Sequence, residues 1–191
     1  YLFKSNFNLS NIMNTKILDF NTNLDSILEL DLFNRYQELI FITDDIIGKT
    51  YSCALDFIAT KFKEKNKKFI IYDIPNGEKS KNIETKIKIE NFMFSNNISR
   101  SKSCLVALGG GVVGDISGYV ASTYKRGIDF IQIPTTIISM VDSSIGGKNG
   151  INNQHGKNLV GTFHLPKYIL IFFALLETSP EKEFINGMAE I

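Results

Sequence analysis

Short apolar runs alternate with longer amphipathic segments along most of this chain. The runs, each typical of a buried strand, are 39–43, 69–74, 104–108, 130–133 and 168–173. Between them, apolar residues recur at helical spacing in 46–65, in 80–97 and in the segment that begins at Val113. Strands that alternate with helices predict an α/β fold, a Rossmann-like, mostly parallel sheet with helices on both faces.

The remaining segments carry weaker patterns. Residues 15–20 could form an edge strand, and Asn23 could cap a short helix through Leu32. We expect a loop at 149–156, a turn at 176–180 and the opening of a further helix at 180–191.

Three consecutive glycines, Gly109 to Gly111, join the run 104–108 to the helix that follows it. Glycine lets a ligand approach the main chain closely. The free N–H groups of a helix's first turn, at the positive end of its dipole, form an anion site, and a diphosphate would suit it. The alternative is a tight turn that binds nothing, with Gly114 and Gly118 allowing the helix to pack close to the sheet.

Polar residues collect where strands are expected to end. Asp44, Glu78, Gly110 and Thr135 all lie at or just beyond such ends. The hydroxyls of Thr135 and Thr136 could cap a new helix or hold a ligand. Because ligands of parallel α/β sheets bind at the carboxyl ends of the strands, these residues predict one shared site.

Composition narrows the classes of function. The chain has 191 residues, 43% of them hydrophobic, and a net charge of +1, which suits one well-buried domain. The balanced charge argues against nucleic acid or a membrane surface as the main partner. No run is long enough to span a bilayer. Cys53 and Cys104 lie in apolar sequence without metal spacing, which favours a reduced, cytoplasmic protein.

Six short motifs make the functional prediction specific. In chain order they are GGGVVGD (109–115), RG (126–127), PTT (134–136), VDSSIGGK (141–148), GKNL (156–159) and NGMAE (186–190). Together they resemble 3-dehydroquinate synthase, and in particular the form that opens the fungal multifunctional shikimate-pathway polypeptide. The resemblance covers most of the chain from Ile40 onward.

The resemblance implies three parts. We expect a ragged lead-in at 1–14, an NAD-binding α/β domain at 15–180 and the start of a truncated C-terminal helical domain at 181–191. Both ends look cut, because the chain begins at Tyr1 and stops one residue after Glu190, inside a family motif. The rest of the family's helical domain, with its acid and base residues, is expected to be missing, so we assign no catalytic residue.

Cofactor contacts follow from the resemblance, residue by residue. The positions that match the family's NAD contacts are Asp44, Glu78, Lys81, Gly110, Gly111, Val112, Asp115, Thr135, Thr136, Lys157, Leu175 and Thr178. Ordinary alternatives stay open for some of them. Asp44 could simply cap the next helix, Glu78 and Lys81 could form a solvated helix start, and Asp115 would be stabilised by a helix dipole in any case.

Substrate contacts also follow from the resemblance, at Arg126, Asp142, Lys148 and Asn158. The matching arginine of the family reaches the substrate phosphate from the neighbouring subunit of a homodimer, and a guanidinium suits phosphate. A surface arginine is the ordinary alternative. Lys148, after two glycines, would by itself suggest only an anion site.

Glu190 matches the family's glutamate ligand to a catalytic Zn²⁺ or Co²⁺, although a lone glutamate near a terminus is usually a solvated residue. The family's two other ligands are histidines of the C-terminal domain. His155 and His164 lack metal spacing, and we interpret them as structural or exposed.

The function implied is conversion of 3-deoxy-arabino-heptulosonate 7-phosphate, a phosphorylated sugar acid, to 3-dehydroquinate and phosphate, with NAD reduced and reoxidised in each cycle. A related polyol dehydrogenase and an inactive NAD-binding fragment remain as alternatives. The segment 141–148 argues against the dehydrogenase, and the retained Asp142, Lys148 and Asn158 argue against long decay.

Overall fold

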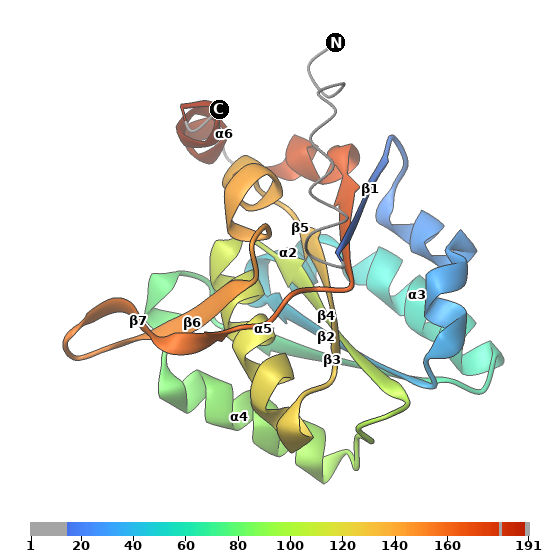
Figure 1. Cartoon of the computed structure of the whole chain (residues 1–191). Helices are drawn as coiled ribbons and strands as arrows, with labels where there is room; N and C mark the ends of the chain where they lie inside the picture. The colour runs from blue at the N-terminus through green and yellow to red at the C-terminus, as the bar shows by residue number, and fades with distance from the viewer. Residues whose placement is uncertain (1–14, 180, 190–191) are drawn as a thin grey trace.

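The computed structural model describes residues 15–179 and 181–189. Six strands form a parallel sheet in the order β1-β8-β5-β4-β2-β3 (Figure 1). They are β1 (Lys16–Phe20), β2 (Glu38–Asp44), β3 (Lys68–Ile74), β4 (Ser103–Gly109), β5 (Asp129–Pro134) and β8 (Tyr168–Phe172). Every pairing in this sheet is parallel, so the predicted α/β fold is confirmed, and the segment expected as an edge strand is β1, at one edge.

Helices cover both faces of the sheet. The helices of the described residues are α2 (Asp45–Thr50), α3 (Ser52–Glu64), α4 (Ile83–Ser95), α5 (Gly111–Thr123) and α6 (Glu181–Met188), of which α6 lies apart from the sheet (Figure 1). Helix α3 packs on one face, whereas α4 and α5 pack on the other (Figure 1). The predicted opening helix after residue 180 is confirmed as α6, and the expected turn before it is the 3-10 helix η6 (Phe173–Thr178). No helix within residues 15–179 and 181–189 is long and apolar enough to cross a membrane.

Two predicted helices have different bounds. The segment expected as one helix from residue 46 to 65 is broken at Tyr51, whose backbone leaves the helical region and whose hydroxyl bonds Thr178 at 2.7 Å. The helix expected from residue 80 begins at Ile83, because Asn82 is its N-cap and accepts a hydrogen bond from Thr85 N, while Glu78–Ser80 form the 3-10 turn η3.

The prediction of a helix capped by Asn23 is wrong. The segment forms two 3-10 helices, η1 (Leu24–Glu29) and η2 (Asp31–Arg35), and the Asn23 side chain makes no capping bond. The apolar residues recur every third position, and side chains three apart align along a 3-10 helix rather than an α-helix. Those residues are Leu24, Ile27, Leu30 and Phe33.

The loop expected at 149–156 is also wrong. Strands β6 (Lys148–Asn153) and β7 (Gly156–Phe163) form an antiparallel hairpin that lies beside α5, outside the main sheet (Figure 1). Few apolar residues mark these strands, and only Ile151 among them is a buried hydrophobic residue. Asn153 closes the turn by accepting hydrogen bonds from His155 N and Gly156 N.

The core lies in two layers, one on each side of the sheet. In β2, Leu39 and Phe41 face α3, whereas Ile40 and Ile42 face α4 and α5, and all four are fully buried. Burial on both faces explains why this strand is a continuous apolar run. Cys104 lies in the α3-side layer, and burial raises the pKa of its thiol well above 9.0. Cys53, expected in apolar surroundings, is exposed instead.

Candidate functional site

The sheet has a switch point between β2 and β4. The two strands are neighbours, with Ile42 opposite Ala107, yet the helices that follow them pack on opposite faces. Chains that leave neighbouring parallel strands toward opposite faces open a crevice at the carboxyl edge, where α/β proteins bind ligands. Asp44 ends β2 and Gly109 ends β4, so the predicted residues flank this crevice.

In the glycine turn at the end of β4, packing requires glycine at position 109 but not at position 110. A Cβ on Gly109 would lie 2.6 Å from Val113 Cγ2, so packing alone demands glycine there. Gly110 has φ −76° and ψ −171°, which any residue adopts. A Cβ there would meet only Thr136, at 3.4 Å. Neither backbone nor packing requires glycine at 110, and the space beside it is open.

Helix α5 starts directly after this turn, and Gly110, at its N-cap, has no side chain with which to cap it. The first N–H groups of a helix have no partner within the helix. With Gly111 and Val112 opening the helix, these amides and the positive end of the dipole remain for an anion.

Hydroxyl groups surround the same turn. The Thr135 N–H donates to Gly109 O at 3.1 Å, which places Thr135 beside the glycines. Thr135 Oγ1 and Ser143 Oγ are buried and have no hydrogen-bond partner in the described part of the chain. Thr136 instead exchanges hydrogen bonds with Ser139 as a local cap, the alternative that the sequence left open. The orphaned Thr135 hydroxyl is therefore the one suited to a ligand.

Asp44 caps the next helix, as its ordinary alternative predicts. Its Oδ1 accepts hydrogen bonds from Ile46 N and Ile47 N at 3.0 and 2.9 Å. Its Oδ2 makes no hydrogen bond with residues 15–179 or 181–189, so a cap and a ligand contact are compatible.

An ion pair and a hydrogen bond, both made by the buried Lys81 ammonium, join three of the predicted site residues. Lys81 is only 5% exposed, and its ammonium bonds Asp115 Oδ2 and, at 2.5 Å, Asn158 Oδ1. Burial raises the pKa of the Asp115 carboxyl above its usual 3.8, and the Lys81 ammonium opposes that rise. The solvated helix start proposed as an alternative for Lys81 is wrong, because tertiary contacts cover this side chain. Two predicted cofactor contacts thus lie against a predicted substrate contact.

Sequence reasoning missed Asn152, in β6. Its Nδ2 donates to Glu78 Oε1 at 2.7 Å, and its Oδ1 accepts from Asn158 N at 2.9 Å. Its own N–H donates to Lys81 O at 2.8 Å. The nearby GKNL motif was the only signal, and it did not point to residue 152 because a loop was expected there.

Five further predicted contacts have free polar groups or pack beside other residues of the chain. Asp142, Lys148 and Lys157 are exposed, and their side chains form no hydrogen bond or ion pair within the described ranges. Thr178 bonds Tyr51, and Leu175 is buried beneath it.

Arg126 lies elsewhere. It follows the C-terminal end of α5 and lines a pocket of about 500 Å³ at the amino edge of the sheet, together with Arg35, Arg100, Asp129 and Lys167. The structure therefore separates Arg126 from Asn158 and the Lys81–Asp115 pair in one copy of the chain, because Asp115 lies near the start of α5 and Arg126 follows its end.

The predicted metal ligand cannot be placed in the structure. Glu190 lies outside the described residues, and the residues that are described contain no group of three His, Cys, Asp or Glu that could hold a metal ion. His155 is exposed in the hairpin turn. His164 stacks on Phe130 and pairs with Ile128 O at 3.1 Å, so the structural interpretation of both histidines is confirmed.

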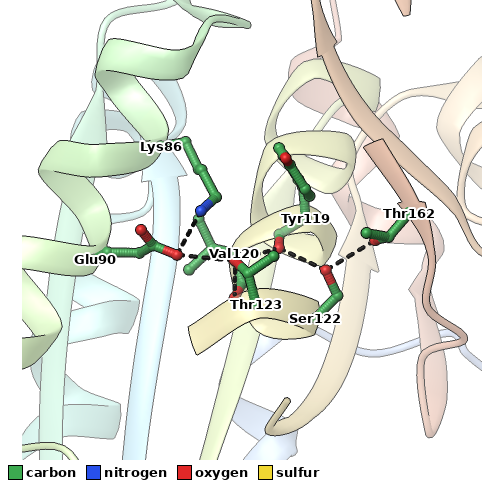
Figure 2. Close-up of polar contacts among 7 residues, drawn as sticks. All are labelled: Lys86, Glu90, Tyr119, Val120, Ser122, Thr123 and Thr162. Atoms are coloured by element: carbon green, nitrogen blue, oxygen red, sulfur yellow. Dashed lines mark hydrogen bonds and ion pairs between the residues drawn. The ribbon is translucent and has the colours of Figure 1, made fainter. Parts of the chain in front are cut away.

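A polar network fixes the hairpin and α5 in place (Figure 2). Glu90 of α4 accepts hydrogen bonds from Lys86 Nζ at 2.6 Å and from Thr123 Oγ1 of α5 at 2.8 Å. The neighbouring residue, Ser122, donates from its Oγ to Tyr119 O and accepts from Thr162 Oγ1 of β7. The network links α4, α5 and the hairpin, so it holds β7 against the C-terminal end of α5.

A Rossmann-like parallel sheet with a glycine turn at its switch point defines an α/β domain of the dinucleotide-binding class. Within this class the chain belongs to the 3-dehydroquinate synthase family, because the model for the N-terminal part of 3-dehydroquinate synthase matches residues 71–186. The family resemblance found in the sequence is thereby confirmed.

Individual relatives agree with this assignment. The chain is 49% identical over 155 residues to the pentafunctional AROM polypeptide of Pneumocystis carinii, covering 80% of this chain and 10% of that protein. It is 44% identical over 155 residues to 3-dehydroquinate synthase of Prochlorococcus marinus, covering 81% of this chain and 41% of the relative. The chain thus spans less than half the length of these curated relatives.

A solved structure agrees as well. The fold matches 2-deoxy-scyllo-inosose synthase, complexed with carbaglucose-6-phosphate, NAD⁺ and Co²⁺, with a TM-score of 0.79 and 26% sequence identity. The match covers 91% of this chain and 46% of the synthase.

Proposed function

We propose that this chain is the NAD-binding portion of a 3-dehydroquinate synthase, a carbon–oxygen lyase of the shikimate pathway. The whole enzyme would convert 3-deoxy-arabino-heptulosonate 7-phosphate to 3-dehydroquinate and phosphate in the cytoplasm. The family assignment and the names of the relatives support this proposal. Because the chain spans 41% of the bacterial synthase, we assign the full reaction to the whole protein and NAD binding to the part described here.

The observation that carries the proposal is the open space at Gly110. The fold itself does not need glycine there, so the residue is best explained by a ligand that must approach the main chain. The uncapped start of α5 makes that ligand an anion, and the diphosphate of NAD fits both features.

The surrounding residues fit the rest of the cofactor. Thr135 Oγ1 is a buried hydroxyl that lacks a partner among the described residues, and a ligand would satisfy it. Asp44 would accept hydrogen bonds from ribose hydroxyls through its free Oδ2. When bound, NAD would supply a temporary hydride acceptor for the substrate carbinol, while these residues fix its orientation.

The substrate would lie beside the cofactor. We assign its phosphate and hydroxyl groups to Lys148, Asn158 and Asp142, since Lys148 and Asp142 have free side chains and Asn158 contacts the Lys81–Asp115 pair. We propose Glu190 as one ligand of a divalent metal, Zn²⁺ or Co²⁺, which would polarise a substrate oxygen as a Lewis acid.

The position of Arg126 supports a homodimer in this proposal. Helix α5 has 13 residues and is therefore about 20 Å long, so Arg126 and Gly111 lie at opposite edges of the sheet. An arginine at the amino edge could serve a substrate phosphate only in the site of a second copy. A homodimer would satisfy that requirement.

Calorimetric titration of NAD into the 191-residue chain tests the proposal. The substitution Gly110→Ala should fold normally, since its Cβ would make an ordinary 3.4 Å contact, and should weaken NAD binding at least about tenfold by blocking the diphosphate. Gly114→Ala is the matched control, because it lies one turn further along α5 and faces Gln132. Equal NAD affinity in folded wild type and Gly110→Ala would refute the assignment.

A related polyol dehydrogenase remains the second candidate. It would share the cofactor site, but it would release NADH, whereas the synthase returns the hydride to its own intermediate. Net accumulation of NADH at 340 nm by the whole protein, on a roughly stoichiometric scale with substrate, would favour the dehydrogenase.

A further inference from the structure

Two segments that are distant in sequence, residues 78–81 and the hairpin, meet at Asn152. Asn152 lies in β6, next to the register shift between Ile151 and Asn153. It makes one hydrogen bond to Glu78, one to the Lys81 main chain and one to the Asn158 main chain. We propose that Asn152 is a positioning residue that fixes the NAD contacts and the substrate contact in one geometry, an inference that rests on the function proposed above.

Glu78 is the first group that Asn152 fixes. Glu78 is exposed, and a free glutamate side chain samples several rotamers. The bond from Asn152 Nδ2 to Glu78 Oε1, at 2.7 Å, holds one carboxylate oxygen and leaves Oε2 for a ligand. A ligand that meets an already oriented carboxylate does not have to bear the cost of ordering it.

Asn158 is the second residue that Asn152 fixes. Its backbone has φ +57°, in the left-handed region that few residues other than glycine adopt; asparagine tolerates this region better than most, and a further hydrogen bond supports it here. The support is the bond from Asn158 N to Asn152 Oδ1, at 2.9 Å. In this conformation Asn158 Oδ1 accepts a hydrogen bond from the Lys81 ammonium, so the hairpin closes on the Lys81–Asp115 pair.

The third contact completes a ring. The Asn152 N–H donates to Lys81 O, and the Lys81 ammonium returns to Asn158. The hairpin is thereby attached to the η3 segment by both main-chain and side-chain bonds. An amide is the group this position needs, because it must donate to a carboxylate and accept from an N–H at the same time. An aspartate would accept from Asn158 but would repel Glu78.

This difference between amide and carboxylate gives the test. NAD is titrated calorimetrically into the full chain in four forms: wild type, Asn152→Ala, Asn152→Asp and the control Gln154→Ala at the exposed hairpin turn. We expect Asn152→Ala to weaken NAD binding about tenfold, the scale of ordering one long side chain. Asn152→Asp should bind more weakly still at low salt, and added salt should reduce its deficit while leaving that of Asn152→Ala unchanged. Gln154→Ala should bind like wild type.

A purely structural role predicts a different result. It would lower the unfolding midpoint of the Asn152 variants without changing their NAD affinity or producing a salt-dependent difference between them. Asn152→Asp keeps the acceptor for Asn158 and is nearly the same size, so it remains testable even if Asn152→Ala fails to fold. Wild-type affinity in a folded Asn152→Asp chain would overturn the inference while the proposed function stands. No NAD binding by the wild type would overturn both.

Discussion

Gly118 in α5 offers a direct test of how the hairpin is attached to the domain. A Cβ at this position would lie 1.9 Å from Asn149 Oδ1 and 2.3 Å from Asn149 Cγ, so Gly118→Ala must displace that side chain. Asn149 is buried, and its Nδ2 donates to Gly147 O at 2.7 Å and to His164 O at 2.8 Å. These two bonds tie together the two ends of the hairpin.

The expected cost follows from these contacts. Displacing Asn149 leaves its buried Nδ2 group and His164 O without partners, whereas Gly147 O keeps the hydrogen bond from His164 N, and each unsatisfied group costs about 1–3 kcal/mol. Alanine improves the helix propensity of an interior position by about 1 kcal/mol relative to glycine. Since the loss exceeds the gain, Gly118→Ala should lower the free energy of unfolding by about 2 kcal/mol, a fall of roughly 4–8 °C in the unfolding midpoint of a chain of this size.

Gly114→Ala is the matched control. It lies in the same helix and is also buried, but its Cβ would meet the end of the Gln132 side chain, at 2.9 Å from Oε1, and that end can move. Its stability should stay within about 1 kcal/mol of wild type, because the helix gain offsets a small rearrangement.

Urea unfolding followed by circular dichroism measures both variants. In an Asn149→Ala background the cost of Gly118→Ala should disappear, since the displaced side chain is already absent. If Gly118→Ala is as stable as Gly114→Ala, or keeps its full cost without Asn149, the proposed contact between α5 and the hairpin is not what stabilises this region.

Two further predictions concern charged residues of the site. In the whole enzyme, Lys148→Ala should lower kcat/KM for the phosphorylated substrate by about 10- to 100-fold, the scale of one hydrogen bond to a charged group, while calorimetry shows unchanged NAD affinity; unaltered turnover would contradict a phosphate contact. Because burial raises the pKa of Asp115 above 3.8, the folded chain binds this proton more tightly than the unfolded chain. We therefore compare wild type with Asp115→Asn by the difference between their free energies of unfolding, wild type minus variant. This difference should fall as pH rises from below 3.8 through the raised pKa of Asp115. A difference that rises with pH would refute the assigned direction.

The sequence by itself determined the main sheet. Strands such as β2 and β4 are buried on both faces, so each had to be a continuous apolar run, and the runs could be recognised without any knowledge of their neighbours. The glycine turn followed for a similar local reason, because glycines between a strand and a helix start are a nearest-neighbour pattern.

Local patterns were insufficient where tertiary contacts supply the stability. The hairpin β6–β7 has no apolar alternation; Asn152 and Thr162 attach it to Glu78 and Ser122, which are distant in sequence, while Asn149 joins its own two ends. A polar, glycine-containing sequence with such long-range partners has the same local appearance as a loop. For the same reason no local pattern pointed to Asn152.

The site was predicted as a set of residues but not as an arrangement. Motif matching selected Lys81, Asp115 and Asn158 separately, and only the folded chain shows that they form one hydrogen-bonded cluster around the buried Lys81. It assigned Arg126 to the substrate of a neighbouring subunit, and only the folded chain shows that α5 carries Arg126 to the edge of the sheet opposite the glycine turn. The sequence shows which side chains are available for chemistry. Which of them lie next to one another depends on how the helices and strands pack, and only the tertiary structure decides that.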